Sequence, residues 1–257
     1  MKNGRLKQSV NNGYGGLDVP SLCRVAAEMG LHGIDFLNEA DWPLARDHGL
    51  VCTMAWASSA PWYEQIPKGL NDPANHDTIV ASLLATIPKA AKAGVPSVIA
   101  FFGNRNRRGD DEAIRNCVAG LERVKKAAED HGVTIALELL NSKVDHKDYQ
   151  GDRTSFGVEV VTRLGSPRVR LLYDIYHMQI MEGDVVRTIC DNHEWIDHFH
   201  TAGVPGRHEP DATQELNYAA VCRAIVETGF TGTLCHEFTP TRDPLQSLRE
   251  AVALCDV

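Results

Sequence analysis

The sequence predicts a single (β/α)₈ barrel, a TIM barrel, formed by residues 1–257 as one domain. Short apolar runs alternate with longer stretches of helical periodicity. Eight such runs in 257 residues leave about 32 residues for each strand–helix unit, the usual size in these barrels. An open doubly wound sheet has the same local pattern, but the count reaches eight and no G-x-G-x-x-G follows the first run. The barrel is therefore favoured over the open sheet.

The apolar runs are the candidate strands. Several are nearly continuous in apolar residues, which is typical of parallel strands buried on both faces. In chain order the runs are RLKQSVN (5–11), HGIDFL (32–37), LVCTMAWA (50–57), SVIAFFG (97–103), VTIALELL (133–140), VRLLYDI (169–175), WIDHFH (195–200) and GTLCHEF (232–238).

The segments between the runs have the periodicity of amphipathic helices. The clearest is 111–131, where apolar side chains form one stripe, Asp110 is placed to cap the start and Gly132 to end the helix. A second helix is predicted from an Asn217 cap to Gly229. The stretch 58–76 has no clear period and is predicted to be a long loop on the active-site rim after the third strand.

Charge and composition disfavour several function classes. The chain has 26 basic and 34 acidic side chains and a net charge of −8, whereas nucleic-acid and anionic-membrane binders need a dominant positive field. No stretch approaches 18 apolar residues, and the first residues contain no apolar signal segment. We therefore expect no nucleic-acid partner and no membrane association.

Cysteine usage indicates the compartment. The seven cysteines are scattered and no pair has C-x-x-C spacing, a pattern that predicts buried free thiols in a reducing environment and a cytoplasmic location. Barrels of this kind often form dimers or tetramers, so a homo-oligomer is compatible with the sequence.

Polar residues directly after the last four apolar runs are the candidate site. These are Glu138, Asp174, His200 and Glu237, separated by 36, 26 and 37 residues, or about one strand–helix unit each. The carboxyl ends of barrel strands meet at one mouth, so three carboxylates and one imidazole should converge there. Each residue taken alone could equally be a satisfied polar side chain; the register of all four favours a shared site.

Three carboxylates in one pocket repel one another unless a cation lies between them. An oxygen-rich ligand set with one imidazole suits Mn²⁺ or Mg²⁺ best, and Co²⁺ or Zn²⁺ are also compatible with it. The sequence therefore predicts a divalent metal ion held by Glu138, Asp174, His200 and Glu237.

Three motifs in the second half of the chain resemble those of a known family. YDIYHMQIMEGDV (173–185), AGVPGRHEPDATQELNY (202–218) and CHEFTP (235–240) are similar to segments of the xylose-isomerase-like barrels, and most of all to the hydroxypyruvate isomerases. The likeness is specific over about 133–240 and only general before that. It implies the same four metal ligands and a contact between His177 and a substrate oxygen. Arg207, in a G-x-P-x-R loop, is a further substrate-binding candidate because its planar guanidinium can bind a carboxylate or a hydroxyl.

The resemblance implies an enzyme of the aldose–ketose isomerase type. Its favoured reaction interconverts hydroxypyruvate and tartronate semialdehyde through an enediolate, with Glu138 and Glu237 as catalytic acid and base. Hydroxypyruvate isomerases carry glutamine at the position of His200, however, and histidine there is usual in the related ketose 3-epimerases. A ketose 3-epimerase acting on tagatose or psicose is therefore the alternative.

Two readings from other classes are weaker. Abasic-site endonucleases share the barrel but gather more histidines around zinc, and the fourth apolar run here ends in FFGN without one. A non-catalytic sugar- or metal-binding barrel would not need the complete set of acids and histidine. Both the isomerase and the epimerase would take a small-molecule hydroxy-acid or sugar substrate.

Other residues near the candidate site have structural alternatives. Arg207 could instead form a rim salt bridge with Glu209 or Asp211. His198 is predicted to be a hydrogen-bonded core histidine below His200, and His236 to face the surrounding helices. Four aromatic residues are candidates for the pocket wall: Trp56, Trp62, Tyr63 and Phe102.

Overall fold

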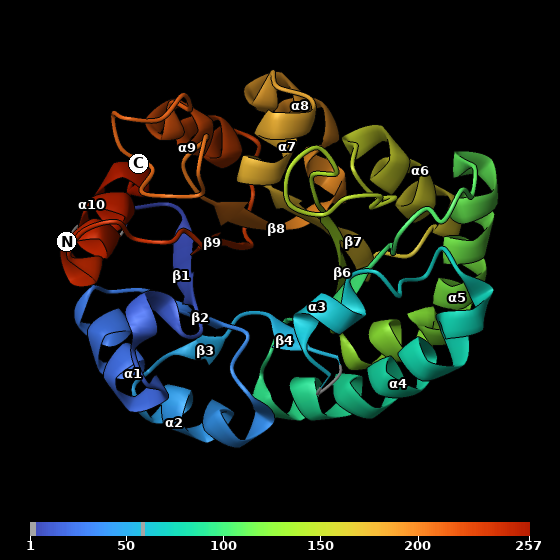
Figure 1. Cartoon of the computed structure of the whole chain (residues 1–257). Coiled ribbons are helices and arrows are strands. Elements are labelled where there is room, and N and C mark those ends of the chain that lie inside the picture. Colours follow the sequence, from blue (N-terminus) through green and yellow to red (C-terminus); the bar gives the residue numbers. More distant parts are fainter. Residues whose placement is uncertain (1–3, 58–59) are drawn as a thin grey trace.

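The computed structural model describes residues 4–57 and 60–257, in which parallel strands form a ring inside a layer of helices (Figure 1). Nine strands lie within these residues: β1 (Lys7–Asn11), β2 (Gly33–Asp35), β3 (Val51–Cys52), β4 (Ala55–Trp56), β5 (Ser97–Phe101), β6 (Thr134–Leu139), β7 (Val169–Asp174), β8 (Ile196–Thr201) and β9 (Thr233–His236). Their order is β3-β2-β1-β9-β8-β7-β6-β5-β4, and every pairing is parallel. The predicted TIM barrel is confirmed.

The count of nine arises because the third predicted strand, 50–57, is divided. Its first part, β3, pairs with β2, and its second part, β4, pairs with β5. Between them Thr53 N donates to Ile34 O at 3.1 Å, and Phe36 N donates to Met54 O at 2.7 Å. The chain therefore passes at this point from one end of the sheet, β3, to the other end, β4, and closes the ring.

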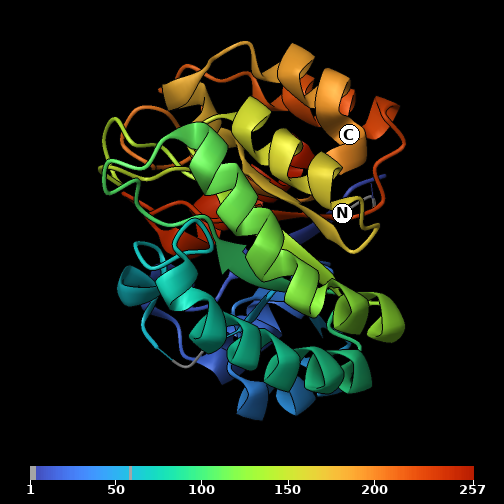
Figure 2. The same ribbon diagram turned by 90° about the vertical axis from the view of Figure 1, so that its right-hand side faces the viewer.

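The helices form the outer layer (Figure 1). They are α1 (Val19–Glu28), α2 (Trp42–Asp47), α3 (Trp62–Gln65), α4 (His76–Ala93), α5 (Asp110–His131), α6 (Thr154–Leu164), α7 (Ile175–Met181), α8 (Val185–Asn192), α9 (Tyr218–Glu227) and α10 (Pro244–Cys255). Figure 2 shows α4 and α5 packed side by side outside the strands. The layer covers the outward faces of the strands, so every residue of β5 and β6 is buried, as their apolar sequences predict.

Helix α5 confirms the predicted stripe but not the predicted cap. Ile114, Cys117 and Leu121 are buried, and Gly132 ends the helix with a φ of 68°. The N-cap position is occupied by Gly109, which has no capping side chain, and Asp110 is the first helical residue. Its carboxylate is 2.9 Å from Arg105 and 2.5 Å from Arg153, so the prediction that it caps α5 is wrong.

The predicted long loop 58–76 contains helical turns. Ser58 and Ser59 lie outside the described residues. Proline at the first turn starts a helix because its fixed φ suits that position: the amides of Glu64 and Gln65 donate to the Pro61 carbonyl at the start of α3, and Pro73 begins a 3₁₀ turn that Asp72 caps. Prolines are also common in loops, and the prediction of an irregular loop is wrong for this part of 58–76.

The cysteines are free, as expected, and all but one are also buried. All seven are free, and six are buried, whereas Cys190 on α8 is exposed. Among residues 4–57 and 60–257, none of the helices combines the length and apolar character that a bilayer crossing requires. The second predicted helix also begins as expected: Asn217 Oδ1 accepts a hydrogen bond from the Ala220 amide at 3.1 Å and caps α9.

Candidate active site

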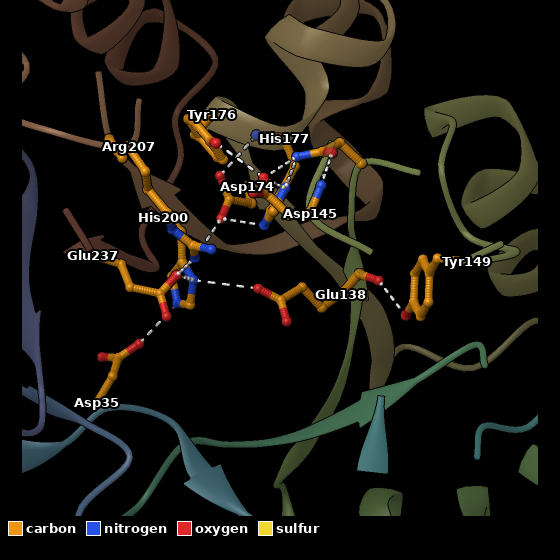
Figure 3. A network of polar contacts seen from close by, with 12 residues as sticks. Asp35, Glu138, Asp145, Tyr149, Asp174, Tyr176, His177, His200, Arg207 and Glu237 are labelled. Carbon is orange, nitrogen blue, oxygen red and sulfur yellow. Dashed lines mark hydrogen bonds and ion pairs between the residues drawn. The ribbon is translucent and has the colours of Figure 1, made fainter. Parts of the chain in front are cut away.

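The four residues predicted at strand ends meet at one point of the barrel (Figure 3). Each can offer one ligand atom such that all four atoms lie within 4.8 Å of one another. We call this group the acid–histidine cluster, and it comprises Glu138 of β6, Asp174 at the end of β7, His200 of β8 and Glu237 directly after β9. These are neighbouring strands in the sheet, and Asp174 is paired in register with His200. Parallel strands with a common register therefore deliver the four side chains to one mouth.

His200 lies at the centre of the cluster. Its Nδ1 is 3.1 Å from Oε2 of Glu237 and 3.4 Å from Oε1 of Glu138, and the side chain is fully buried. Its Nε2 is 3.2 Å from Oδ2 of Asp35 on the opposite side of the ring. One ring nitrogen therefore faces the two glutamates, and the other is occupied by a separate carboxylate.

Asp35, at the end of β2, was not among the predicted site residues. It is fully buried, its Oδ1 accepts hydrogen bonds from Ser9 (2.8 Å) and Thr53, and its Oδ2 is 2.7 Å from His198 Nε2. The sequence signal was available, because Asp35 follows an apolar run just as Glu138 does. The site predicted from the sequence comprised residues of the last four apolar runs, and Asp35 belongs to the second run.

Burial and neighbouring charges shift the pKa values of Asp174 and Glu237 in opposite directions. Burial raises the pKa of Asp174 to about 7 against the opposing effects of Arg207 and His200. Burial would also raise the pKa of Glu237, but Arg207 and His200 lower it to about 2. Burial alone would lower the pKa of His200, yet Glu237 and Asp35 raise it well above its usual range. The surrounding side chains therefore compensate the negative charge of Asp174 less than that of Glu237.

The donor set fits a divalent cation. Atoms of three carboxylates and one imidazole lie within 4.8 Å of one another, and oxygen-rich sets with one imidazole are typical of Mn²⁺ or Mg²⁺ sites. A second group with the same spacing consists of Asp35, His198, His200 and Cys235. All four are buried and none lines the cavity, whereas Glu138 and Glu237 do. The acid–histidine cluster is the group that a substrate can reach.

His177, in the first turn of α7, is fully buried beside the cluster. Its Nε2 is 3.6 Å from Oδ2 of Asp174, and its backbone amide donates to Oδ1 of the same carboxylate at 3.1 Å. Burial lowers the pKa of His177 well below its usual range. His177 is therefore not a surface side chain, because it is fully buried and lines the cavity from within the fold.

Arg207 reaches from the loop after β8 into the site. One of its terminal nitrogens is 2.5 Å from Oε2 of Glu237 and 3.8 Å from Oδ2 of Asp174, and its guanidinium lies over the Tyr176 ring at 5.3 Å. The rim salt bridge considered from the sequence is not formed, because Glu209 and Asp211 pair with Arg242 instead. Arg207 therefore places a guanidinium charge beside two acids of the cluster, Glu237 and Asp174.

The two other predicted histidines are structural. His198 lies on the inner face of β8 below His200 and contacts Asp35. His236 is fully buried and bonds Oε1 of Gln8 at 2.8 Å, while Nε2 of Gln8 donates to the Val252 carbonyl of α10. That bond places His236 on the side of the ring that faces the helices, as the strand alternation predicts.

A cavity of about 610 Å³ opens above the cluster. One wall is aromatic: Phe36 and Trp56 stack with ring centroids 4.3 Å apart, and the Phe36 ring meets His200 edge-on at 5.7 Å. The opposite wall is polar and includes His146, His177 and Arg207. The cavity can hold a small polar compound between a water-excluding surface and a set of hydrogen-bonding groups.

The predicted aromatic wall is correct only in part. Trp56 lines the cavity, but Phe102 is fully buried against Tyr149 and Phe156, and Tyr63 is 61% exposed on the surface. The side chain of Trp62 lies outside the described part of the structure. Hydrophobicity after a strand does not by itself tell a cavity wall from the core.

Comparisons with known proteins identify relatives of two kinds. The chain is 35% identical over 114 residues to a 2-oxo-tetronate isomerase of Cupriavidus necator, covering 44% of this chain and 43% of that protein. It is 31% identical over 114 residues to the hydroxypyruvate isomerase of Escherichia coli, covering 43% of this chain and 44% of that protein. The aligned stretch thus spans less than half the length of these relatives.

A solved structure with the same fold is the D-psicose 3-epimerase of Clostridium cellulolyticum H10. It superposes with a TM-score of 0.76 over 98% of this chain and 97% of that chain at 19% sequence identity, a likeness that shows the fold. The family model for the xylose isomerase-like TIM barrel matches residues 23–256. The resemblance predicted from the motifs is thereby confirmed, and the chain belongs to the xylose isomerase-like TIM barrel family.

Proposed function

We propose that the protein is a metal-dependent isomerase that moves a proton between adjacent carbons of a small hydroxy-carbonyl acid. The favoured reaction interconverts hydroxypyruvate and tartronate semialdehyde. The observation that carries the proposal is the acid–histidine cluster, in which two glutamates flank one imidazole at the floor of a cavity. The 2-oxo-tetronate and hydroxypyruvate isomerases among the relatives support the same class of substrate.

The reaction needs one group to remove a proton from the carbon beside a carbonyl and another to return it to the neighbouring carbon. Glu138 and Glu237 have the required chemistry and both line the cavity. We assign the acid and base roles to this pair of glutamates. The enediolate formed between the two steps carries negative charge, which Arg207 and other donors on the polar wall can stabilise.

The metal ion would be held by the four side chains of the acid–histidine cluster. When bound, a divalent ion supplies Lewis-acid polarisation of adjacent substrate oxygens and a template for their orientation. Mn²⁺ or Mg²⁺ is the preferred ion and Co²⁺ or Zn²⁺ would also suit the site. Nδ1 of His200 faces the glutamates while Asp35 occupies Nε2, so the imidazole is oriented with its free nitrogen toward the metal.

A substrate panel tests the proposal. Apo protein reloaded with Mn²⁺, Mg²⁺ or Co²⁺ should convert hydroxypyruvate, and the four-carbon 2-oxo-tetronate is the natural second acid to assay. Turnover that requires a divalent ion and prefers an acid supports the isomerase. Metal binding without turnover of any acid or ketose would support a non-catalytic binding barrel and contradict the proposal.

A ketose 3-epimerase is the second candidate, and His200 is the observation that favours it. In that reaction the same two glutamates would work on opposite faces of one carbon of an uncharged sugar. If tagatose, psicose or another ketose shows the higher kcat/KM in the wild-type protein, the epimerase replaces the isomerase as the function.

Arg207→Lys should weaken turnover of hydroxypyruvate by roughly 1.5–3 kcal/mol in kcat/KM, the scale of a hydrogen bond to a charged group. The planar guanidinium can bind a substrate carboxylate through two hydrogen bonds, which an ammonium group cannot reproduce. Uncharged ketoses should lose less. Arg163→Lys, on the exposed face of α6, is the control; an equal loss for acids and ketoses would show that Arg207 does not select the carboxylate.

Asp35→Asn should lower metal affinity by roughly 10–100-fold while the protein stays folded, because Asp35 orients the ligand His200. The new amide can keep its oxygen toward Ser9 and Thr53, which directs its NH₂ group at Nε2 and moves the histidine proton to Nδ1. Calorimetric titration with Mn²⁺ or Co²⁺ measures the effect, with Asp184→Asn as an exposed control. Unchanged affinity would exclude the orienting role.

We also propose a cytoplasmic location, which the free and mostly buried cysteines support, and a small molecule as the only substrate class. The net charge of −8 continues to argue against nucleic acid as a partner. Size-exclusion chromatography with light scattering would test the homo-oligomer that the sequence left open.

A further inference from the structure

The amide of Asn141, two residues after β6, has a fixed orientation. Its Oδ1 accepts hydrogen bonds from the backbone amides of Val144 and Asp145, both at 2.9 Å. Backbone N–H groups can only donate, so the atom that faces them must be the oxygen. The NH₂ end of Asn141 therefore points the other way, into the buried space between the loop and α7.

That NH₂ group meets two acceptors. It lies 2.6 Å from Nδ1 of His177 and 2.6 Å from Oδ2 of Asp145, and the same Asp145 oxygen accepts the Tyr176 hydroxyl at 2.9 Å. An amide nitrogen has no lone pair to offer, so Nδ1 of His177 must accept its proton and cannot carry one itself. The imidazole is then neutral, with its single proton on Nε2.

Nε2 of His177 is the atom left free for a substrate. It is buried and has no hydrogen-bond partner among the described residues, and the side chain lines the cavity. The nearest acid, Asp174, has its Oδ2 3.6 Å away, beyond a normal hydrogen bond. A buried N–H without a partner is costly unless a ligand completes it.

We propose that Asn141 is a positioning residue that locks His177 in the tautomer with the proton on Nε2, so that His177 presents a fixed hydrogen-bond donor to the reacting compound. The donor suits an oxygen that gains negative charge, such as the carbonyl oxygen of a hydroxy-carbonyl substrate becoming an enediolate oxygen. With its proton on Nε2, His177 cannot act as a base toward the substrate, so proton transfer at carbon is left to the two glutamates. The identity of that oxygen rests on the proposed function; the tautomer does not.

The tautomer can be measured without any assay of activity. Full-length protein labelled with ¹⁵N in its histidines is studied by long-range ¹H–¹⁵N correlation, and His177→Gln identifies the signals of His177. The expected spectrum has a pyridine-type Nδ1 and a pyrrole-type Nε2. A proton on Nδ1 in the wild-type protein would overturn the proposal.

Two variants test what Asn141 does. Asn141→Asp offers an acceptor to Nδ1 and should move the proton there, but it also places two carboxylates side by side. Asn141→Asp combined with Asp145→Asn keeps one amide and one carboxylate in the pair and guards against misfolding. Both should show a protonated Nδ1, whereas Asn217→Asp, which exchanges the exposed α9 cap for an equally good one, should leave the His177 signals unchanged.

Kinetic measurements on these variants show whether Asn141 positions His177 for the reaction or only supports the fold. The double variant should lose roughly 10–100-fold in kcat/KM, mainly in kcat, since a donor that strengthens in the transition state is lost. A moved proton with unchanged kinetics would refute the role of the donor in the reaction. If the wild-type spectrum is as expected but no hydroxy-carbonyl compound reacts, the positioning role of Asn141 stands and the proposed reaction fails.

Discussion

Replacing Glu138 or Glu237 by glutamine is expected to reduce turnover by roughly 10²–10⁴-fold, the contribution of general acid–base catalysis, and further through damage to the metal site. Glutamine nearly preserves the shape of the side chain and keeps one oxygen, so contacts to His200 and Arg207 can persist. It cannot accept a proton from carbon. The loss should therefore appear in kcat.

Steady-state kinetics on the best substrate of the panel measures this effect, with thermal unfolding to show that each variant is folded. Glu227→Gln, at the exposed end of α9, is the matched control and should retain full activity. Turnover within tenfold of the wild type in either variant would reject the catalytic role of that glutamate. A loss in only one variant would mean that a single glutamate handles both proton transfers.

Removing Asp174 is expected to abolish tight metal binding. Asp174 is 1% exposed, and the surrounding side chains compensate its negative charge less than that of Glu237, so a bound cation should interact strongly with it. Asp174→Ala removes the ligand but also the α7 cap, which accepts the His177 amide. Asp174→Asn keeps the cap oxygen and removes the charge, and both variants should bind metal far more weakly than the wild-type protein.

Metal analysis of the purified proteins and calorimetric titration of the apo forms provide the measurement. Asp18→Asn alters an exposed capping carboxylate on α1 and is the control for the loss of one acid at a helix start. Unchanged metal stoichiometry in Asp174→Ala would remove Asp174 from the ligand set. Loss of binding in Asp174→Ala alone, with binding intact in Asp174→Asn, would show that the carbonyl oxygen suffices as a ligand.

The sequence predicts that polar residues at the carboxyl ends of strands meet at one mouth, and this holds where the strand itself fixes the position of the residue. Glu138, Asp174 and His200 each follow or end an apolar run, and parallel strands in register bring such residues to one mouth whatever the loops do. Asp35 in HGIDFL also ends an apolar strand, so the same pattern points to it as well.

Predictions in loops depended on partners that no local pattern reveals. Glu209 and Asp211 lie close to Arg207 in the sequence, yet Arg207 forms its ion pair with Glu237. The reason is Arg242, 35 residues further along the chain, which pairs with both Glu209 and Asp211. Asn141 has no motif at all. Its importance arises because Nδ2 of Asn141, in the loop after β6, lies 2.6 Å from Nδ1 of His177 on α7.

The sequence by itself determined the barrel, the strand-end positions of the four residues in the acid–histidine cluster, and the family. Hydrophobic periodicity and residues at strand ends are local properties that a chain carries into any folded state, so they can be read in order. Only the tertiary structure decided that Asp35 faces His200 across the ring, that Arg207 enters the site, and that Asn141 sets the proton of His177. Each of these depends on distances and donor directions between segments far apart in the chain, and hydrogen bonding is too directional for sequence spacing to specify it.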